Sequence, residues 1–336
     1  MKIKNGKVSF IIGVSIGVIL IACVSADSVK PIVNNVDSSS EDAAQDKEVN
    51  IPGKDNYQVY ALDIPLNSNF AKELVPLNNL IVKEALDKEL LSNAYWHSNS
   101  FMYIKRASRW FPIIEPILKK NNIPDDFKYL AVIESGLTNA TSPSGAKGFW
   151  QFMPKTANDY NLEISNDIEE RYNLKMSTEA ACIYLQRAYD EFGNWTLAAA
   201  SYNMGKTGLL NQLKKQKVNN YYDLLLNAET ARYVYRMIAV KYILKDPAKF
   251  GFIVREDLQY QTFKSVEITI DSSVTNWADF AISQHTNYKI LKRLNPWLIS
   301  NKLDNPSGKE YRLKLPIPGT GLDIIAPTDN KFGNDE

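Results

Sequence analysis

At 336 residues, the chain is long enough for about two globular domains with extensions, and 45% hydrophobic residues are enough to build packed cores. The formal net charge at pH 7 is only +1, which provides no general attraction for a polyanion. We therefore expect an ordinary globular protein that does not bind nucleic acid.

The first residues have the organisation of an export signal. Lys2, Lys4 and Lys7 form a basic start, and an apolar run follows over residues 8–23. That run is short for a membrane span, which needs about 20 apolar residues. We predict a signal peptide over residues 1–22 and an exported, periplasmic protein.

The end of this segment leaves two cleavage sites open. Residues 20–23 (LIAC) resemble a bacterial lipobox, in which Cys23 is lipidated and anchors the protein to the outer membrane. Ordinary signal cleavage after residues 24–26 (VSA) is the alternative. We favour the lipoprotein because a thiol at that position is otherwise unexplained. Residues 23–60, rich in Ser, Asp, Asn and Lys, are expected to form a flexible tether.

Helical spacing of apolar residues begins after the tether. We expect an N-terminal helical extension over residues 61–104 and a main domain over residues 105–250, with a helix near residues 99–120. His97 has no neighbouring residues able to complete a metal site, so neither metal nor cofactor is expected. Cys182, in a predicted helix that begins at Ser177, is expected to be a buried small hydrophobe.

The most informative stretch begins with a predicted helix over residues 124–135, which a Ser-Gly pair ends. Phe127, Leu130, Ala131 and Glu134 fall at i, i+3, i+4 and i+7, so they share one face of that helix. Glu134 therefore lies on the apolar face and in the last turn.

This placement affects the chemistry of Glu134. Burial raises the pKa of a carboxyl group, and the negative end of a helix dipole acts in the same direction. A carboxyl that keeps its proton near neutral pH is able to donate it to a leaving oxygen. The alternative is a structural Glu that reaches a surface Lys or Arg.

The sequence after Glu134 favours one catalytic carboxylate. Residues 135–158 contain no Asp or Glu, whereas a two-carboxylate glycosidase needs a second acid across the bond. A turn-rich loop over residues 142–148 leads into the large apolar residues of 149–154, which suit the wall of a sugar-binding cleft.

Several motifs resemble the signature of soluble-lytic-transglycosylase domains, with the membrane-bound murein transglycosylase D type as the most similar subgroup. They are residues 134–136 (ESG), 145–154 (GAKGFWQFMP), 156–157 (TA), 198–205 (AAASYNMG) and 229–234 (ETARYV). Their order and spacing agree with the family from about residue 105 to residue 245. Ser201 and Met204 depart from the usual Ala-Tyr-Asn-Ala-Gly pattern, and Met204 is expected to change the packing beneath Tyr202.

The resemblance implies a lysozyme-like, mainly helical domain that cleaves the β-1,4 bond between N-acetylmuramic acid and N-acetylglucosamine, with 1,6-anhydro ends. It implies that Glu134 is the only catalytic acid and base, and that Tyr202 hydrogen-bonds its carboxyl group. The residues expected to bind the glycan are Ser142, Gly148, Gln151, Met153, Tyr202, Asn203, Glu229 and Tyr233.

Residues 166–175 are rich in charge, with Asp167, Glu169, Glu170 and Arg171. We expect a solvated face there, and a second catalytic carboxylate among these residues is the alternative.

The C-terminal part changes character and predicts a small α+β module over residues 258–318, followed by a tail over residues 319–336. Its strand-helix-helix-strand order is similar to a LysM module, which binds N-acetylglucosamine chains. The usual Gly-Asp turn before the first helix is replaced by residues 271–273 (DSS), so glycan binding and a structural role both remain open.

The sequence thus predicts a mainly α protein that acts as a monomeric lytic transglycosylase on peptidoglycan strands. A hydrolytic muramidase and a non-catalytic peptidoglycan-binding protein are the alternatives.

Overall fold

The computed structural model describes residues 59–324. The expected signal peptide, Cys23 and nearly all of the tether therefore lie outside the described residues, as does most of the tail. Between residues 59 and 324, no helix is both long and apolar enough to cross a membrane.

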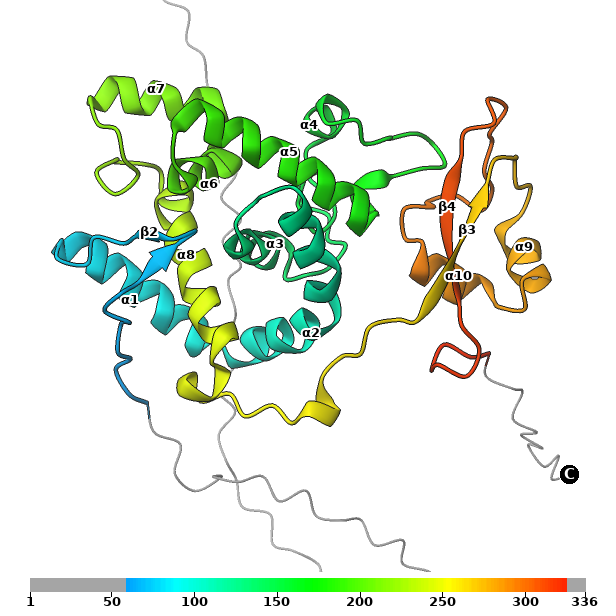
Figure 1. The fold of residues 1–336 in the computed structure, drawn as a ribbon, viewed down its shortest axis with the longest axis horizontal. Helices are drawn as coiled ribbons and strands as arrows, with labels where there is room; N and C mark the ends of the chain where they lie inside the picture. The colour runs from blue at the N-terminus through cyan, green and yellow to red at the C-terminus, as the bar shows by residue number, and fades with distance from the viewer. Residues whose placement is uncertain (1–58, 325–336) are drawn as a thin grey trace, which may run out of the picture. The chain divides into compact units, whose positions relative to one another are not determined.

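The structure confirms the mainly helical class, with a small β-containing module at the C-terminal end (Figure 1). A short hairpin of two strands, each of two residues, precedes the helices: β1 (Asn69–Phe70) and β2 (Glu73–Leu74). The helices of the main domain are α1 (Leu80–Ala94), α2 (His97–Lys120), α3 (Lys128–Ser135), α4 (Pro154–Asp159), α5 (Leu174–Phe192), α6 (Trp195–Met204), α7 (Lys206–Gln216) and α8 (Ala228–Lys245).

Helix boundaries follow local capping. The predicted helix from residue 124 starts as a 3-10 turn, Asp125–Phe127, before α3, and it ends where Gly136 adopts a left-handed conformation with φ of 60°. The predicted start of α5 at Ser177 is wrong by three residues, because the Asn173 side chain accepts a hydrogen bond from the Met176 amide and caps the helix earlier.

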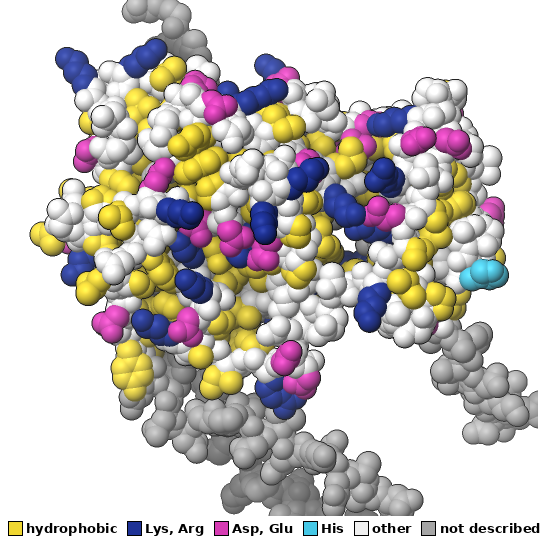
Figure 2. All heavy atoms as spheres, in the orientation of Figure 1, with side chains coloured by type: hydrophobic (Ala, Val, Ile, Leu, Met, Phe, Trp, Pro, Cys, Tyr) yellow, Lys and Arg dark blue, Asp and Glu magenta, His cyan; other side chains and the backbone are white. Residues whose placement is uncertain are grey.

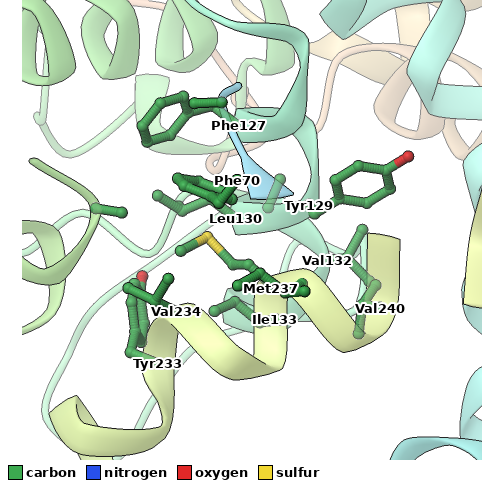
Figure 3. Packing of buried hydrophobic residues seen from close by; sticks show 14 of the residues in the cluster. Phe70, Phe127, Tyr129, Leu130, Val132, Ile133, Tyr233, Val234, Met237 and Val240 are labelled. Atoms are coloured by element: carbon green, nitrogen blue, oxygen red, sulfur yellow. The ribbon is translucent and has the colours of Figure 1, made fainter. Parts of the chain in front are cut away.

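The core of the main domain is built around α3 and α8. Leu130 and Ile133 of α3 are buried, and they lie opposite Val234 and Met237 of α8 (Figure 3). Since α3 has only eight residues, it depends on this packing rather than on its own hydrogen bonds for stability. The chemistry-bearing end of α3 is therefore fixed relative to α8.

The N-terminal extension belongs to the same core. Val82, Leu86 and Leu90 of α1 are buried in the cluster that also contains the residues of α3, and α1 packs along α8. The expected boundary between residues 104 and 105 falls inside α2.

An ion pair joins α1 to α8 beside this core. The Glu89 side chain is 1% exposed, and its two oxygens accept hydrogen bonds from Nε and Nη2 of Arg232 at 2.5 and 3.0 Å. Arg232, in contrast, is 47% exposed. The buried Glu89 carboxylate therefore needs the ion pair, whereas Arg232 is also solvated by water.

This asymmetry gives a stability prediction. Replacing Arg232 with Met leaves a buried carboxylate without its cation, and we expect a loss on the order of 3 kcal/mol in the free energy of unfolding in urea. The double variant Arg232→Met/Glu89→Leu should recover most of that loss, since an apolar pair removes the unpaired charge. Equal losses for the single and double variants would contradict the argument.

The C-terminal module confirms the predicted strand-helix-helix-strand order. Its strands pair antiparallel, with Ser265 opposite Pro316 and Ile270 opposite Tyr311, and its own core contains Trp277 and Leu313. The elements are β3 (Ser265–Ile270), α9 (Trp277–Ser283), α10 (Tyr288–Leu294) and β4 (Tyr311–Pro316).

The expectation of a solvated face over residues 166–175 is wrong. Ile168 lies in the hydrophobic core of the C-terminal module, and the backbone of this segment bonds to that of residues 297–299. The four charged side chains that suggested a solvated face are all buried: Asp167, Glu169, Glu170 and Arg171. The segment connects the two cores instead of facing water.

Candidate active site

Glu134 lies in the last turn of α3, where its side chain is mostly buried. The Tyr233 hydroxyl of α8 donates a hydrogen bond to Oε1 of Glu134. The packing of α3 on α8 brings these two groups together although they are 99 residues apart in the chain.

The surroundings favour the neutral form of this carboxyl group. Burial raises the pKa of Glu134 from its usual 4.5 to about 7, against the hydrogen bond from Tyr233 and the charge of Arg236, which lower it. The negative charge of Glu229 adds to the increase. With a pKa near 7, a substantial fraction of Glu134 is protonated at neutral pH and is able to release the proton, which is what a general acid requires.

Tyr202 does not have the expected hydrogen bond to Glu134. Its hydroxyl donates to the carbonyl oxygen of Trp150 at 2.8 Å, and Tyr233 takes the position beside the carboxyl group. The Tyr202 ring packs against Tyr184 and Phe152, with ring centroids 4.9 and 5.9 Å away. Tyr202 therefore holds the backbone of the loop after Glu134, and the hydroxyl that donates to the Glu134 carboxyl is that of Tyr233.

Asn203 and Glu229 are hydrogen-bonded to each other, and Glu229 is near enough to Glu134 for its charge to act on that carboxyl group. Nδ2 of Asn203 donates to Oε1 of Glu229 at 3.0 Å, and Oδ1 of Asn203 accepts from the Thr230 hydroxyl at 2.6 Å. Glu229 lies in the first turn of α8, where the helix dipole stabilises its negative charge. The fold thus supplies a second carboxylate near Glu134, although the sequence around Glu134 has none.

Two residues that were expected to line sugar subsites hold the loop over residues 142–152 in shape. The Ser142 hydroxyl accepts a hydrogen bond from the Ala146 amide. Nε2 of Gln151 donates to the carbonyl oxygens of Ala140 and Gly148 at 3.1 and 2.8 Å. In contrast, Met153 is 42% exposed and is available to a ligand.

Gly148 has a steric reason to be glycine. Its φ is +83°, and a Cβ at this position would lie 1.9 Å from the carbonyl oxygen of Arg171. No other residue type fits such an approach without moving the backbone. The loop that follows Glu134 is therefore packed directly against the segment that contains Arg171.

Arg171 supports the loop from behind. Nη1 of Arg171 donates to the carbonyl oxygens of Gly145 and Phe152, each at 2.9 Å. Glu169 pairs with Nε of Arg171 at 2.7 Å and with Lys147 at 3.1 Å, and these cations lower the pKa of Glu169 although burial opposes them. Glu169 is thus an ionised structural partner and does not serve as a second catalytic acid.

Sequence reasoning missed Arg236. It donates a hydrogen bond to the carbonyl oxygen of Ile133, at 3.3 Å, and its charge lowers the pKa of Glu134. Glu229, Tyr233 and Arg236 are at i, i+4 and i+7 on α8, so they form one polar stripe. That spacing was the available signal.

Two further expectations concern residues outside this group. Between residues 59 and 324, no cluster of His, Cys, Asp and Glu is suited to hold a metal ion. Cys182 is buried, and burial raises the pKa of its thiol to about 12. Such a thiol is an unreactive core residue.

Two parts of the chain are similar to known protein families. Residues 111–225 match the model of the transglycosylase SLT domain. This part of the chain is therefore similar to SLT domains. Residues 266–319 match the model of the soluble lytic transglycosylase C-terminal LysM-like domain, which confirms the predicted kinship of the module.

The similarity to curated relatives extends beyond these residues. The chain is 27% identical over 273 residues to membrane-bound lytic murein transglycosylase D of two Escherichia coli strains, K12 and O6:H1. The match includes 79% of this chain and 59% of the relatives, so the chain spans about six tenths of their length.

Solved structures similar to part of the chain include two lytic transglycosylases. One is the 70 kDa enzyme of E. coli, with 19% identity, a TM-score of 0.35 and coverage of 46% of this chain and 27% of the other. The second is an inactive mutant of lytic transglycosylase Slt from Pseudomonas aeruginosa, with 19% identity, a TM-score of 0.33 and coverage of 46% and 26%.

The raised pKa of Glu134 makes a prediction about stability. Glu134 binds its proton more tightly in the folded state than in the unfolded state. The free energy of unfolding of the protein therefore falls as the pH rises from 4.5 through about 7. Glu134→Gln does not titrate, so its advantage over the wild type in the free energy of unfolding should grow by roughly 2–3 kcal/mol between about pH 5 and pH 8. Urea titrations of both proteins across this range measure the difference. A constant difference would mean that Glu134 has an ordinary pKa.

Proposed function

We propose that this protein is a peptidoglycan lytic transglycosylase in which Glu134 is the catalytic acid and then the base. The observation that carries the proposal is a carboxyl group whose pKa burial raises to about 7, on an SLT domain, with a tyrosine hydroxyl bonded to it. The names of the relatives support murein as the substrate.

In the first step, protonated Glu134 gives its proton to the glycosidic oxygen, and the bond from that oxygen to C1 of the muramoyl sugar breaks. The N-acetyl group of the same sugar stabilises the positive charge that develops at C1. Glu134 is left as a carboxylate, which the Tyr233 hydroxyl and the charge of Arg236 stabilise.

In the second step, the Glu134 carboxylate takes the proton of the muramoyl 6-hydroxyl group, and its oxygen forms a bond to C1. The product is a 1,6-anhydro ring, and no water is consumed. Glu134 regains its proton and is ready for the next bond. Since one group both gives and takes the proton, a pKa near neutrality suits both steps.

The setting of this activity is part of the proposal. Lipidation of Cys23 after removal of residues 1–22 would hold a monomeric enzyme at the outer membrane, beside its polymeric substrate in the periplasm. The LysM-like module and the exposed Met153 would add contacts to the glycan.

Product analysis of digested murein tests the reaction. Wild-type protein should release fragments with anhydro ends, identified by mass, and Glu134→Gln should lower turnover at least 1000-fold while its melting temperature stays at or above that of the wild type. Glu229→Gln serves as the matched control, since it removes the second carboxylate and should retain anhydro products at a reduced rate.

Two results would favour the alternatives. Hydrated reducing ends, together with loss of turnover in Glu229→Gln, would identify a two-carboxylate hydrolase. Wild-type protein that sediments with murein and releases no fragments would be a non-catalytic binding protein.

Tyr233 gives a second prediction. The hydrogen bond from its hydroxyl group favours the ionised form of Glu134, so Tyr233→Phe should raise the pKa of that carboxyl. The alkaline limb of kcat/KM against pH should move up by about one pH unit. Tyr202→Phe, which loses a bond to Trp150 instead, should leave the limb in place. A shift in Tyr202→Phe alone would contradict the observed pairing.

A further inference from the structure

A cavity of about 1490 Å³ lies where the SLT domain and the LysM-like module meet, and Glu134 does not line it. Its walls include Arg109 and Trp110 of α2, Thr138 from the loop after Glu134, Phe263 from the segment that joins the two cores, and Arg293 of α10. Nothing in the proposed reaction uses this cavity.

The cavity is basic. More than twice as many Lys and Arg as Asp and Glu line it. In Figure 2, Lys and Arg side chains border the hollow between the helical core and the C-terminal module. Two lysines of the lining are already neutralised, because Lys175 pairs with Glu267 and Lys309 pairs with Glu163. Within the described part of the chain, the other cations of the lining form no ion pair with a carboxylate; they are Arg106, Arg109, Lys289, Lys292, Arg293, Arg312 and Lys314.

Arg109 and Arg293 lie against the same aromatic ring. Their guanidinium carbons are 4.2 and 5.7 Å from the centroid of Phe263. Among the described residues, neither arginine pairs with a carboxylate, and Arg109 donates its Nε proton to the carbonyl oxygen of Gln261. Burial and the neighbouring Arg293 lower the pKa of Arg109, as expected for like charges held close without an anion.

The cavity begins close to the candidate active site. Nη1 of Arg106 donates to the carbonyl oxygen of Gly136 at 2.9 Å, and Thr138 and Asn139 form part of the wall. Glu134 is therefore only a few residues from the rim. A ligand with a sugar at Glu134 and a substituent in the cavity would have to span only this short stretch of the chain.

We propose that this cavity binds the acidic peptide stem of the glycan strand, with Arg109 and Arg293 holding a carboxylate of that stem. This identification of the ligand rests on the proposed function, since muramoyl sugars carry peptides with free carboxylates. A guanidinium fork matches a carboxylate with two parallel hydrogen bonds, and two arginines without acidic partners supply such forks. Trp110 and Tyr260 add apolar faces for the rest of the peptide.

A phosphate group would satisfy the same two arginines, so the test compares both anions. The full chain with Glu134→Gln is titrated calorimetrically with a synthetic alanyl-γ-D-glutamyl peptide that has free carboxylates, with its fully amidated form, and with inorganic phosphate. We expect the free acid to bind, the amide to bind at least tenfold more weakly, and phosphate to bind more weakly than the acid. Tighter binding of phosphate would overturn the peptide assignment.

Two variants test whether the free-acid peptide binds in the cavity. Arg293→Met in the same background should weaken binding of the free acid about tenfold, because one charge-assisted hydrogen-bonding partner is lost. Arg293 is exposed, so its replacement should not disturb folding. Lys215→Met on α7 makes the same change in net charge away from the cavity and should leave the affinity unchanged. Equal affinities in all three proteins would refute the site.

Turnover provides a second measurement. In otherwise wild-type protein, the ratio of kcat/KM for stem-bearing glycan to that for glycan stripped of its stems should fall about tenfold in Arg293→Met and stay unchanged in Lys215→Met. An unchanged ratio in Arg293→Met would contradict the proposal.

The two proposals fail separately. Calorimetry on the Glu134→Gln background involves no turnover, so loss of acid binding in Arg293→Met supports the site even if murein yields no anhydro ends. Conversely, if murein yields anhydro products but Arg293→Met binds the free-acid peptide as tightly as its parent, the proposed reaction stands and this peptide site is excluded.

Discussion

The contact between the Tyr233 hydroxyl and the Glu134 carboxyl group is the interaction on which the candidate site depends, and it exists only because α3 and α8 are packed together. An eight-residue helix has little stability of its own, so the position of Glu134 is set by the helices around it. Those neighbours are fixed in turn by ion pairs that are at least partly buried. Glu89 pairs with Arg232, and Lys241 of α8 pairs with Asp126 at 2.7 Å just before α3. The N-terminal extension therefore helps to place the acid indirectly, through α8.

The loop after Glu134 shows a different use of charge. Arg171 and Glu169 are almost completely buried, and they are tolerated because each is paired and hydrogen-bonded. Their role is to hold carbonyl groups of the glycine-containing loop, while Gly148 allows the closest approach of the two segments. Its ionic partners lower the pKa of Glu169, whereas burial raises the pKa of Glu134 to about 7 despite the Tyr233 hydrogen bond and the charge of Arg236. The pKa of the same residue type is thus shifted in opposite directions at two positions 35 residues apart in the chain.

Much of the fold was predictable because local signals were strong. The apolar spacing of 127–134 predicted the face on which Glu134 lies, and the Ser-Gly pair after it predicted the end of that helix. Non-local contacts were not predictable. Nothing near Tyr202 or Tyr233 in sequence tells which hydroxyl reaches Glu134, and burial of residues 167–171 requires the C-terminal module as a partner. Charged residues in a loop indicate solvent only when no other part of the chain is available to cover them.

The inclusion of Ile168 in the core of the LysM-like module has a consequence for how the protein unfolds. A segment that belongs to one domain in sequence and to the other in packing couples their melting, so heat should disrupt both in one cooperative transition. A truncated protein that ends before β3 would keep Ile168 but lose its cover, and it would expose a new apolar patch beside buried charges. The solubility of such a fragment would therefore report on the contact between Ile168 and the C-terminal module more directly than its activity would.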